Sequence, residues 1–241
     1  RDEFGRTAGR RIVVEKRLDG EEVSVLALSD GERLLILPPA RDHKRVGDGD
    51  RGPNTGGMGA FAPSRRLSPE LMARVEREIL RPTIEGMSAE GRPFRGVLFA
   101  GLMITPAGEP MLLEHNVRFG DPECEALMAL LDGDLYRLCE SAARGQLDPS
   151  AIQIPPGRTA LTVILAAHGY PAAPRTGDVI YGLDEASHRL VQRLLAVREV
   201  EGDGPLLVGD EHRFASGELQ EPIEEGRASP KVALITRKRV F

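Results

Sequence analysis

The sequence predicts an α+β fold, in which antiparallel strands joined by turns are combined with a few short helices. Three observations support this prediction. Apolar and β-branched runs are separated by the turn residues Asp19-Gly20 and Ser29-Asp30-Gly31, as in β-hairpins. A helical pattern begins at Ser68, and two shorter helical patterns lie within residues 122–144. The chain has 241 residues, which is long enough to bury a sizeable core.

The first half of the chain is predicted to be mostly strand and loop. Strands are expected at residues 12–14, 23–28 and 33–37. Residues 38–63 are rich in Gly, Pro and charges without apolar periodicity, which predicts one long loop, and such loops are usually functional or disordered. Ser68 and Pro69 match the N-cap and first position of a helix, which we expect to kink or end near Pro82.

The second half begins with two strands that are predicted to pair in antiparallel orientation, at residues 95–105 and 110–115. Two short helices are expected at 122–131 and 134–144, followed by a proline-containing linker at 145–157. We therefore predict two domains, residues 1–148 and 149–241. Within the second domain, the expected elements are strands at 159–167 and 232–236 and an amphipathic helix at 185–197.

The composition argues against several classes of protein. The longest apolar run has the length of a strand, so no membrane-spanning segment is predicted. A formal net charge of −5, 4% aromatic residues and the absence of Trp disfavour binding to nucleic acid. Cys124 and Cys139 form no Cys-x-x-Cys motif, so we expect reduced thiols in the cytoplasm. These features favour a cytoplasmic protein that acts on small molecules.

A metal site is predicted where the strand at 110–115 ends. Glu114 and Asn116 lie two residues apart, and strand side chains alternate between faces, so both oxygen ligands point to one side and His115 to the other. Such a pair suits Mg²⁺, which uses few protein oxygens and keeps water and phosphate ligands. Arg118, Asp121 and Glu123 follow at once. The alternative is an ordinary solvated strand end.

The long loop could hold an anionic ligand. Its cations can contact phosphate oxygens, and the backbone N–H groups of its glycine-rich part, residues 52–59, can surround an anion. His43 could contact substrate, although a lone histidine is usually structural. The alternatives are a charged, solvated loop here and an ordinary charged turn at residues 15–22.

Two strings in these segments, DHKRVGDGDRGPNTGGMGAF and EHNVRFGDPE, resemble the glycinamide ribonucleotide synthetase (phosphoribosylamine–glycine ligase) family, and the similarity extends over residues 9–183. The resemblance implies the carboxy-terminal half of an ATP-grasp fold, followed by part of a smaller β-rich domain. In the family an amino-terminal domain and the first lobe of the grasp precede this part. Lys16-Arg17 replaces the acidic and aromatic pair that is more common there.

The resemblance also implies roles for individual residues. Glu15 and Leu18 correspond to the hinge that reads adenine, Glu22 to the acid that holds the ribose, and Glu114 and Asn116 to ligands of Mg²⁺ or Mn²⁺. Lys44 and Arg118 are the expected catalytic cations. The residues expected to bind substrate are Asp42, Asn54, Thr55, Gly56, Gly57, Asp121 and Glu123.

The activity implied is ATP-dependent ligation of glycine to 5-phosphoribosylamine through a glycyl phosphate, in purine biosynthesis, by a protein that is monomeric in its full-length form. Two alternatives are another ATP-grasp carboxylate–amine ligase and a fragment that binds nucleotide without turnover. Beyond about residue 186 the resemblance fades. We expect residues 187–241 to be loosely packed, the alternative being a diverged form of the family's carboxy-terminal domain.

Overall fold

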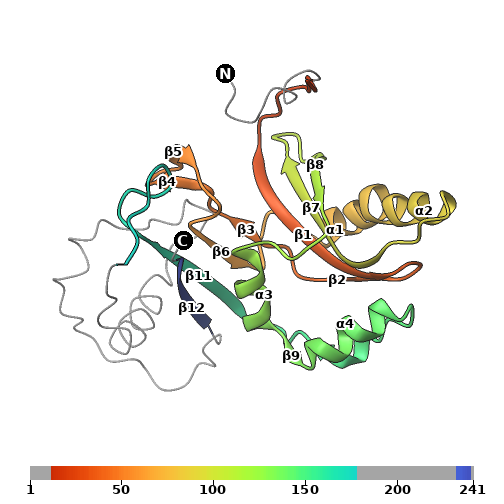
Figure 1. Ribbon diagram of the computed structural model, residues 1–241. Helices are drawn as coiled ribbons and strands as arrows, with labels where there is room; N and C mark the ends of the chain where they lie inside the picture. Colours follow the sequence, from red (N-terminus) through yellow and green to blue (C-terminus); the bar gives the residue numbers. More distant parts are fainter. Residues whose placement is uncertain (1–11, 178–231, 240–241) are drawn as a thin grey trace.

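The computed structural model describes residues 12–177 and the strand at 232–239 (Figure 1). Two four-stranded sheets organise this part of the chain, with two further pairs of short strands. The strands are β1 (Glu21–Asp30), β2 (Leu34–Ile36), β3 (Arg41–Asp42), β4 (Arg45–Gly47), β5 (Arg51–Asn54), β6 (Gly59–Ala62), β7 (Arg95–Ile104), β8 (Pro110–Asn116), β9 (Asp132–Gly133), β10 (Ile152–Gln153), β11 (Thr159–Ala166) and β12 (Val232–Arg239). The α-helices are α1 (Pro69–Val75), α2 (Arg81–Ala89), α3 (Glu123–Leu130) and α4 (Leu135–Ala143), with a π-helical segment at Glu76–Leu80 and a 3₁₀ turn at Pro149–Ala151.

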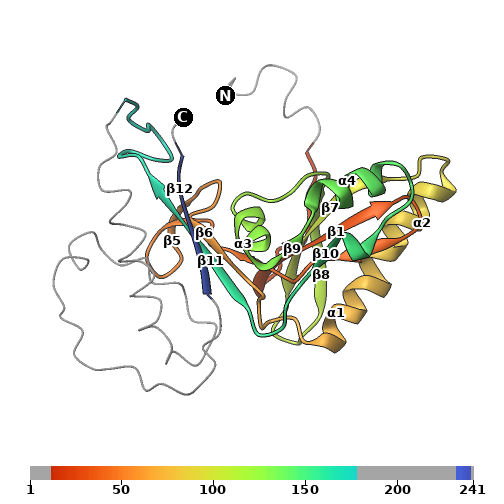
Figure 2. The same cartoon turned by 90° about the horizontal axis from the view of Figure 1, so that it is seen from below.

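The larger sheet has the order β2-β1-β7-β8, and all its neighbouring strands are antiparallel. Both of its faces are covered: α1 and α2 lie on one side and α4 on the other (Figures 1 and 2). Residues of β1 alternate between these faces, so that Val25 and Ala27 pack with α1 and α2, while Leu26 and Leu28 pack toward α3 and α4. Burial on both sides explains the continuous buried run from Val23 to Asp30.

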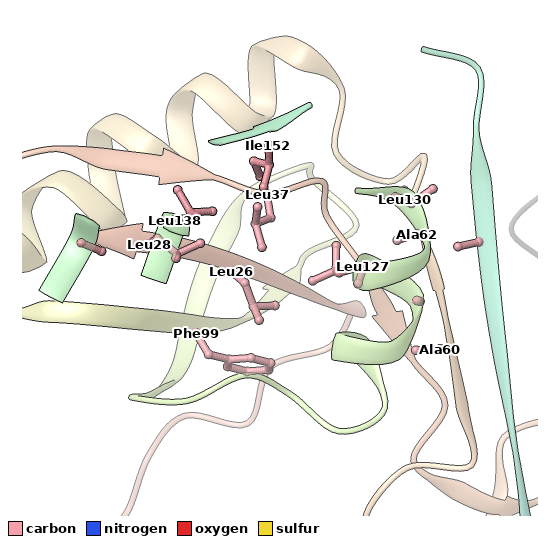
Figure 3. Close-up of a cluster of buried hydrophobic side chains, with 14 of the residues drawn as sticks. Leu26, Leu28, Leu37, Ala60, Ala62, Phe99, Leu127, Leu130, Leu138 and Ile152 are labelled. Carbon is pink, nitrogen blue, oxygen red and sulfur yellow. The ribbon is translucent and has the colours of Figure 1, made fainter. Parts of the chain in front are cut away.

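Two hydrophobic clusters form the core. The cluster under α1 and α2, called here the α1/α2 core, contains Val23, Val25, Ala27, Leu67, Val75, Leu80, Ile84, Leu98, Ala100, Leu102 and Ile104. The α3/α4 core includes Leu26, Leu28, Leu37, Ala60, Ala62, Phe99, Leu127, Leu130, Leu138 and Ile152 (Figure 3). The α3/α4 core joins the larger sheet to the second sheet, whose order is β12-β11-β6-β3. It therefore fixes the two sheets relative to each other.

The helix predicted at Ser68 is confirmed at its start. The Ser68 hydroxyl accepts a hydrogen bond from the N–H of Leu71, and Pro69 occupies the first turn. The helix does not end at Pro82 but passes through the π-helical segment just before it. There the N–H of Arg81 bonds to the carbonyl of Glu76, five residues back. Because Pro82 has no N–H to donate, this wider turn lets the helical segment continue to Ala89.

Several other predicted elements are confirmed. The antiparallel pair is β7 and β8, the two short helices are α3 and α4, and the strands at 159–167 and 232–236 are β11 and β12, which are parallel neighbours. The helix expected at 185–197 and most of the tail after residue 186 lie outside the described residues. Among the residues that are described, no helix is long and apolar enough to cross a bilayer.

Three predictions about local structure were wrong. Residues 12–14 form no strand, and Ile12, Val13 and Val14 are 78–85% exposed, because β-branched residues need a neighbouring strand to pair with. The segment 38–63 is not one loop but carries β3, β4, β5 and β6. Residues 145–157 do not form a free linker, because Leu147 is buried and β10 pairs with β9. The domain division at residue 148 stays a prediction.

Candidate active site

The candidate site lies where β1, β3 and β8 approach the start of α3. Ser24 of β1 and Ala40 exchange two backbone hydrogen bonds of 2.8 Å, and these bonds hold the chain entering β3 against the start of β1. As a result, Glu22 and Lys44 form an ion pair of 2.7 Å between Oε2 and Nζ. Two of the residues predicted from the sequence are therefore in direct contact.

Lys44 is surrounded by acidic side chains. Its burial favours the neutral amine, but the hydrogen bond and charge of Glu22, and then the charges of Asp42 and Glu114, outweigh burial and raise the pKa of Lys44 above its ordinary value. Lys44 is therefore a fixed cation at neutral pH. It contacts Glu22 near the start of β1 and interacts through charge with Glu114 near the end of β8.

Glu114 and Asn116 point to the same side, as predicted, and the Asn116 amide Nδ2 donates a hydrogen bond of 3.2 Å to Glu114 Oε1. The sequence pattern did not indicate which face of the sheet this is. A β-bulge decides it: Leu102 pairs with Leu112 but Gly101 pairs with Glu114, so Leu113 is an extra residue in β8. Glu114 and Asn116 therefore turn away from the α1/α2 core.

The oxygen atoms of this pair fit Mg²⁺. A carboxylate and an amide carbonyl are ligands that a hard cation accepts, and Mg²⁺ usually keeps waters and nucleotide phosphates in its other positions. Within the described part of the chain, no group of three or more His, Cys, Asp or Glu side chains is arranged to hold a metal.

Asp42 and Glu123 form a second acidic group beside the first. Glu123 begins α3, is 3% exposed, and accepts a hydrogen bond of 2.7 Å from the Ser24 hydroxyl to Oε1. Burial, and then the charge of Glu123, raise the pKa of Asp42 to about 8, although Lys44 opposes this shift. Asp42 Oδ1 is buried and has no hydrogen-bond partner among the described residues. A cationic or hydrogen-donating ligand would satisfy this oxygen.

Gly57 brings the glycine-rich loop against this acidic group. A Cβ at this position would lie 2.3 Å from Pro122 Cδ and 2.8 Å from Asp42 Oδ1, and its φ of +114° also disfavours side chains. Gly120 has a similar role, because a Cβ there would lie 2.3 Å from Glu123 Oε2. The glycine at position 57 therefore allows the two loops to pack this closely, and the glycine at position 120 leaves room for the Glu123 carboxylate.

The neighbouring loop residues are ordered by hydrogen bonds. The Thr55 hydroxyl donates to the Lys44 carbonyl at 2.8 Å and accepts from the Gly57 N–H at 3.0 Å. The Gly56 N–H donates to the Tyr170 hydroxyl at 3.0 Å. Asn54 lies in β5, is exposed and pairs with Arg45. Thr55, Gly56 and Gly57 thus lie beside Lys44 and Asp42, with Asn54 at the end of the adjoining hairpin.

The remaining predicted site residues differ in their surroundings. Arg118 is exposed, and its guanidinium donates to the Phe119 carbonyl at 2.8 Å. Glu15 and Leu18 lie in a segment without regular secondary structure before β1. The Asp121 carbonyl oxygen would lie 3.2 Å from a Cβ at position 57, so the backbone of Asp121 takes part in the contact between the two loops. Their expected roles stay predictions.

The surroundings of the His43 side chain indicate a role in packing. Its ring packs against Phe61 with centroids 6.0 Å apart, and its Nε2 is buried without a hydrogen-bond partner in the described part of the chain. Burial and the charge of Arg41 lower the pKa of His43. A neutral ring is therefore favoured.

Sequence analysis missed two residues, Ser24 and Tyr170, that contact the predicted site. Ser24 was detectable as a polar residue within an otherwise apolar strand. Tyr170 carried no comparable signal, because it is brought to Gly56 by the pairing of β11 with β6.

Comparisons with known proteins identify the family of this chain. The family model described as phosphoribosylglycinamide synthetase, ATP-grasp (A) domain, matches residues 1–124. Phosphoribosylamine–glycine ligase of Xanthomonas axonopodis pv. citri is 52% identical over 177 residues, 73% of this chain and 41% of that protein. The Brucella melitensis ligase is 53% identical over 182 residues, 76% of this chain and 42% of that protein.

A solved structure shows the same similarity. The crystal structure of phosphoribosylamine–glycine ligase from Thermotoga maritima has a TM-score of 0.61 and 39% identity, covering 68% of this chain and 40% of that one. This chain thus spans about two fifths of the length of these three relatives.

Proposed function

Because this chain belongs to the phosphoribosylglycinamide synthetase family, with an ATP-grasp fold, we propose that it is part of an enzyme that ligates glycine to 5-phosphoribosylamine. The products are glycinamide ribonucleotide, ADP and phosphate, and the pathway is purine biosynthesis. The observation that supports this proposal best is the contact between three segments distant in sequence, which bring Glu22 and Lys44 together beside Asp42 and Glu114.

The proposed reaction has two steps. A glycine carboxylate oxygen attacks the γ-phosphorus of ATP, so that a P–O bond forms, ADP leaves and glycyl phosphate results. The amine nitrogen of phosphoribosylamine then attacks the carbonyl carbon, a C–N bond forms, phosphate leaves and the nitrogen loses a proton. Both steps move negative charge, so positioned cations and hydrogen-bond donors are the main requirement.

The residues of this chain are assigned as follows. Glu114 and Asn116 would hold Mg²⁺ or Mn²⁺, which offsets negative charge on the phosphates when bound. Lys44 and Arg118 supply positive charge during phosphoryl transfer, and Glu22 holds both Lys44 and the ribose. The Asn54–Gly57 loop residues contact the substrate.

The acidic pair is assigned to the amine. A raised pKa of about 8 lets Asp42 give up or accept a proton near neutral pH, and Glu123 and Asp121 lie beside it. We assign Asp42 and Glu123 to binding the amine nitrogen that reacts. Glu15 and Leu18 are assigned to the adenine, by family resemblance alone. We further propose that the enzyme is monomeric and cytoplasmic and that its substrates are small molecules.

The test is glycine-dependent and phosphoribosylamine-dependent release of ADP. It is measured for the chain alone and with the amino-terminal part of a homologous ligase supplied in trans. Release that needs both substrates, and that Glu114→Gln abolishes, is the expected result. Binding of Mg²⁺ and ADP without substrate-dependent release under either condition would instead favour the non-catalytic alternative.

A further inference from the structure

His115 connects the end of β8 to the helix that covers it. Its Nε2 lies 3.1 Å from the Thr83 hydroxyl, and its Nδ1 lies 3.2 Å from the Phe99 carbonyl. The Thr83 hydroxyl also donates to the Ile79 carbonyl at 2.7 Å, which orients it on the helix. The imidazole therefore joins the helix to two strands of the sheet.

The end of β8 needs such a connection because of its position. β8 is the last strand in the order β2-β1-β7-β8, so among the described strands only β7 pairs with it. Its ladder to β7 is also interrupted by the bulge at Leu113. An edge strand with an irregular ladder can shift its register by one residue, and such a shift turns every side chain to the opposite face.

The register determines which side chains face the site. Ala100 belongs to the α1/α2 core and is paired with His115, so His115 lies on the helix side. Leu102, in the same core, is paired with Leu112. Without the extra residue between them, alternation from Leu112 would place Glu114 on the helix side and His115 on the site side.

We propose that Thr83 and His115 are positioning residues that hold the bulged register and so direct Glu114 and Asn116 toward the site. The helix supplies Thr83 just after its π-helical segment, where Ile79 carries the carbonyl that Thr83 binds. π-Helical segments frequently occur at functional sites, and here the segment is followed by the residue that contacts β8. The inference rests on the proposed metal-binding role of Glu114 and Asn116.

The test compares three single substitutions in α2. Thr83→Val keeps the shape of the side chain but removes the hydroxyl, Thr83→Ser keeps the hydroxyl, and Ile84→Val trims the adjacent buried residue without touching His115. Thermal unfolding of each variant sets a temperature at which all are folded. Binding of Mn²⁺ with saturating ADP is then followed by electron paramagnetic resonance, and the affinity for ADP alone is measured in parallel.

The expected result is that Thr83→Val weakens Mn²⁺ binding by about tenfold, in the range found when groups that orient metal ligands are removed. Thr83→Ser and Ile84→Val should bind Mn²⁺ as wild type does, and the affinity for ADP alone should be the same in all four proteins. Unchanged Mn²⁺ binding by Thr83→Val would overturn the positioning role while leaving the metal site in place, as would an equal loss in Ile84→Val. An absence of Mn²⁺ binding in the wild type would overturn the metal assignment and the positioning role with it.

Discussion

Glu22 and Lys44 are joined by an ion pair of 2.7 Å, although one residue lies near the start of β1 and the other follows β3. The two were predicted separately, one as a nucleotide ligand and the other as a catalytic cation. Their contact means that the charge state and the position of Lys44 depend on Glu22. The same lysine is influenced by Asp42 and Glu114, so the acidic residues of the candidate site share one cation.

Replacing Glu22 should make Lys44 more reactive. In Glu22→Gln the charge of Glu22 no longer opposes the effect of burial, so the pKa of Lys44 should fall. At a pH below the pKa, each unit of decrease raises the fraction of neutral amine about tenfold. Acetylation by a limited amount of anhydride, followed by peptide mass spectrometry, measures the rate at Lys44. The exposed Lys16 is the internal control. Equal rates at Lys44 in both proteins would contradict the pairing.

The protonation of Asp42 should make stability depend on pH. Its pKa of about 8 in the folded protein exceeds the ordinary 3.8, so between these values the folded state holds a proton that the unfolded state releases. The free energy of unfolding should therefore fall as pH rises through this window, by up to about 1.4 kcal/mol per pH unit. Urea denaturation from pH 5 to 8 should show this loss in the wild type relative to Asp42→Asn. A constant difference between the two proteins would argue against a protonated Asp42.

Removing the hydroxyl of Ser24 should destabilise the fold. Ser24 is buried and donates to Glu123, so Ser24→Ala leaves a buried carboxyl oxygen without a donor. The expected cost is about 1.5–3 kcal/mol, which is typical for hydrogen bonds to charged groups. Ser88→Ala, on the exposed side of α2, is the matched control and should change stability by less than about 0.5 kcal/mol. Similar unfolding midpoints for the two variants would show that the Ser24 hydroxyl is dispensable.

Gly57 should not tolerate even a methyl group. In Gly57→Ala the new Cβ meets Pro122 and Asp42, and the backbone conformation is strained as well. Gly108→Ala separates these effects, because Gly108 has a φ of +78° but nothing within 4 Å of its Cβ position. Gly57→Ala should be less stable than Gly108→Ala by about 2 kcal/mol, the typical cost of overpacking. If the two variants lose equal stability in denaturant titrations, the loops do not pack as described.

The amino-acid sequence by itself determined the local elements of this protein. The Ser68 cap, the turn between β7 and β8, and the short helices α3 and α4 were predictable, because each depends on residues a few positions apart. The same holds for the shared direction of Glu114 and Asn116, since alternation along a strand is a local property. The strings that resemble the family were equally readable, because they are continuous in sequence.

Tertiary structure decided the rest. Residues 12–14 have strand-forming side chains but pair with none of the described strands, so their local preference was not realised. The face to which Glu114 points depends on one extra residue in the pairing of β8 with β7. The contact of Ser24 with Glu123, 99 residues apart, depends on how the start of α3 packs on β1. Sheet order, register and the packing of glycine loops are relations between distant segments, and a local pattern carries no information about the partner that each segment will meet.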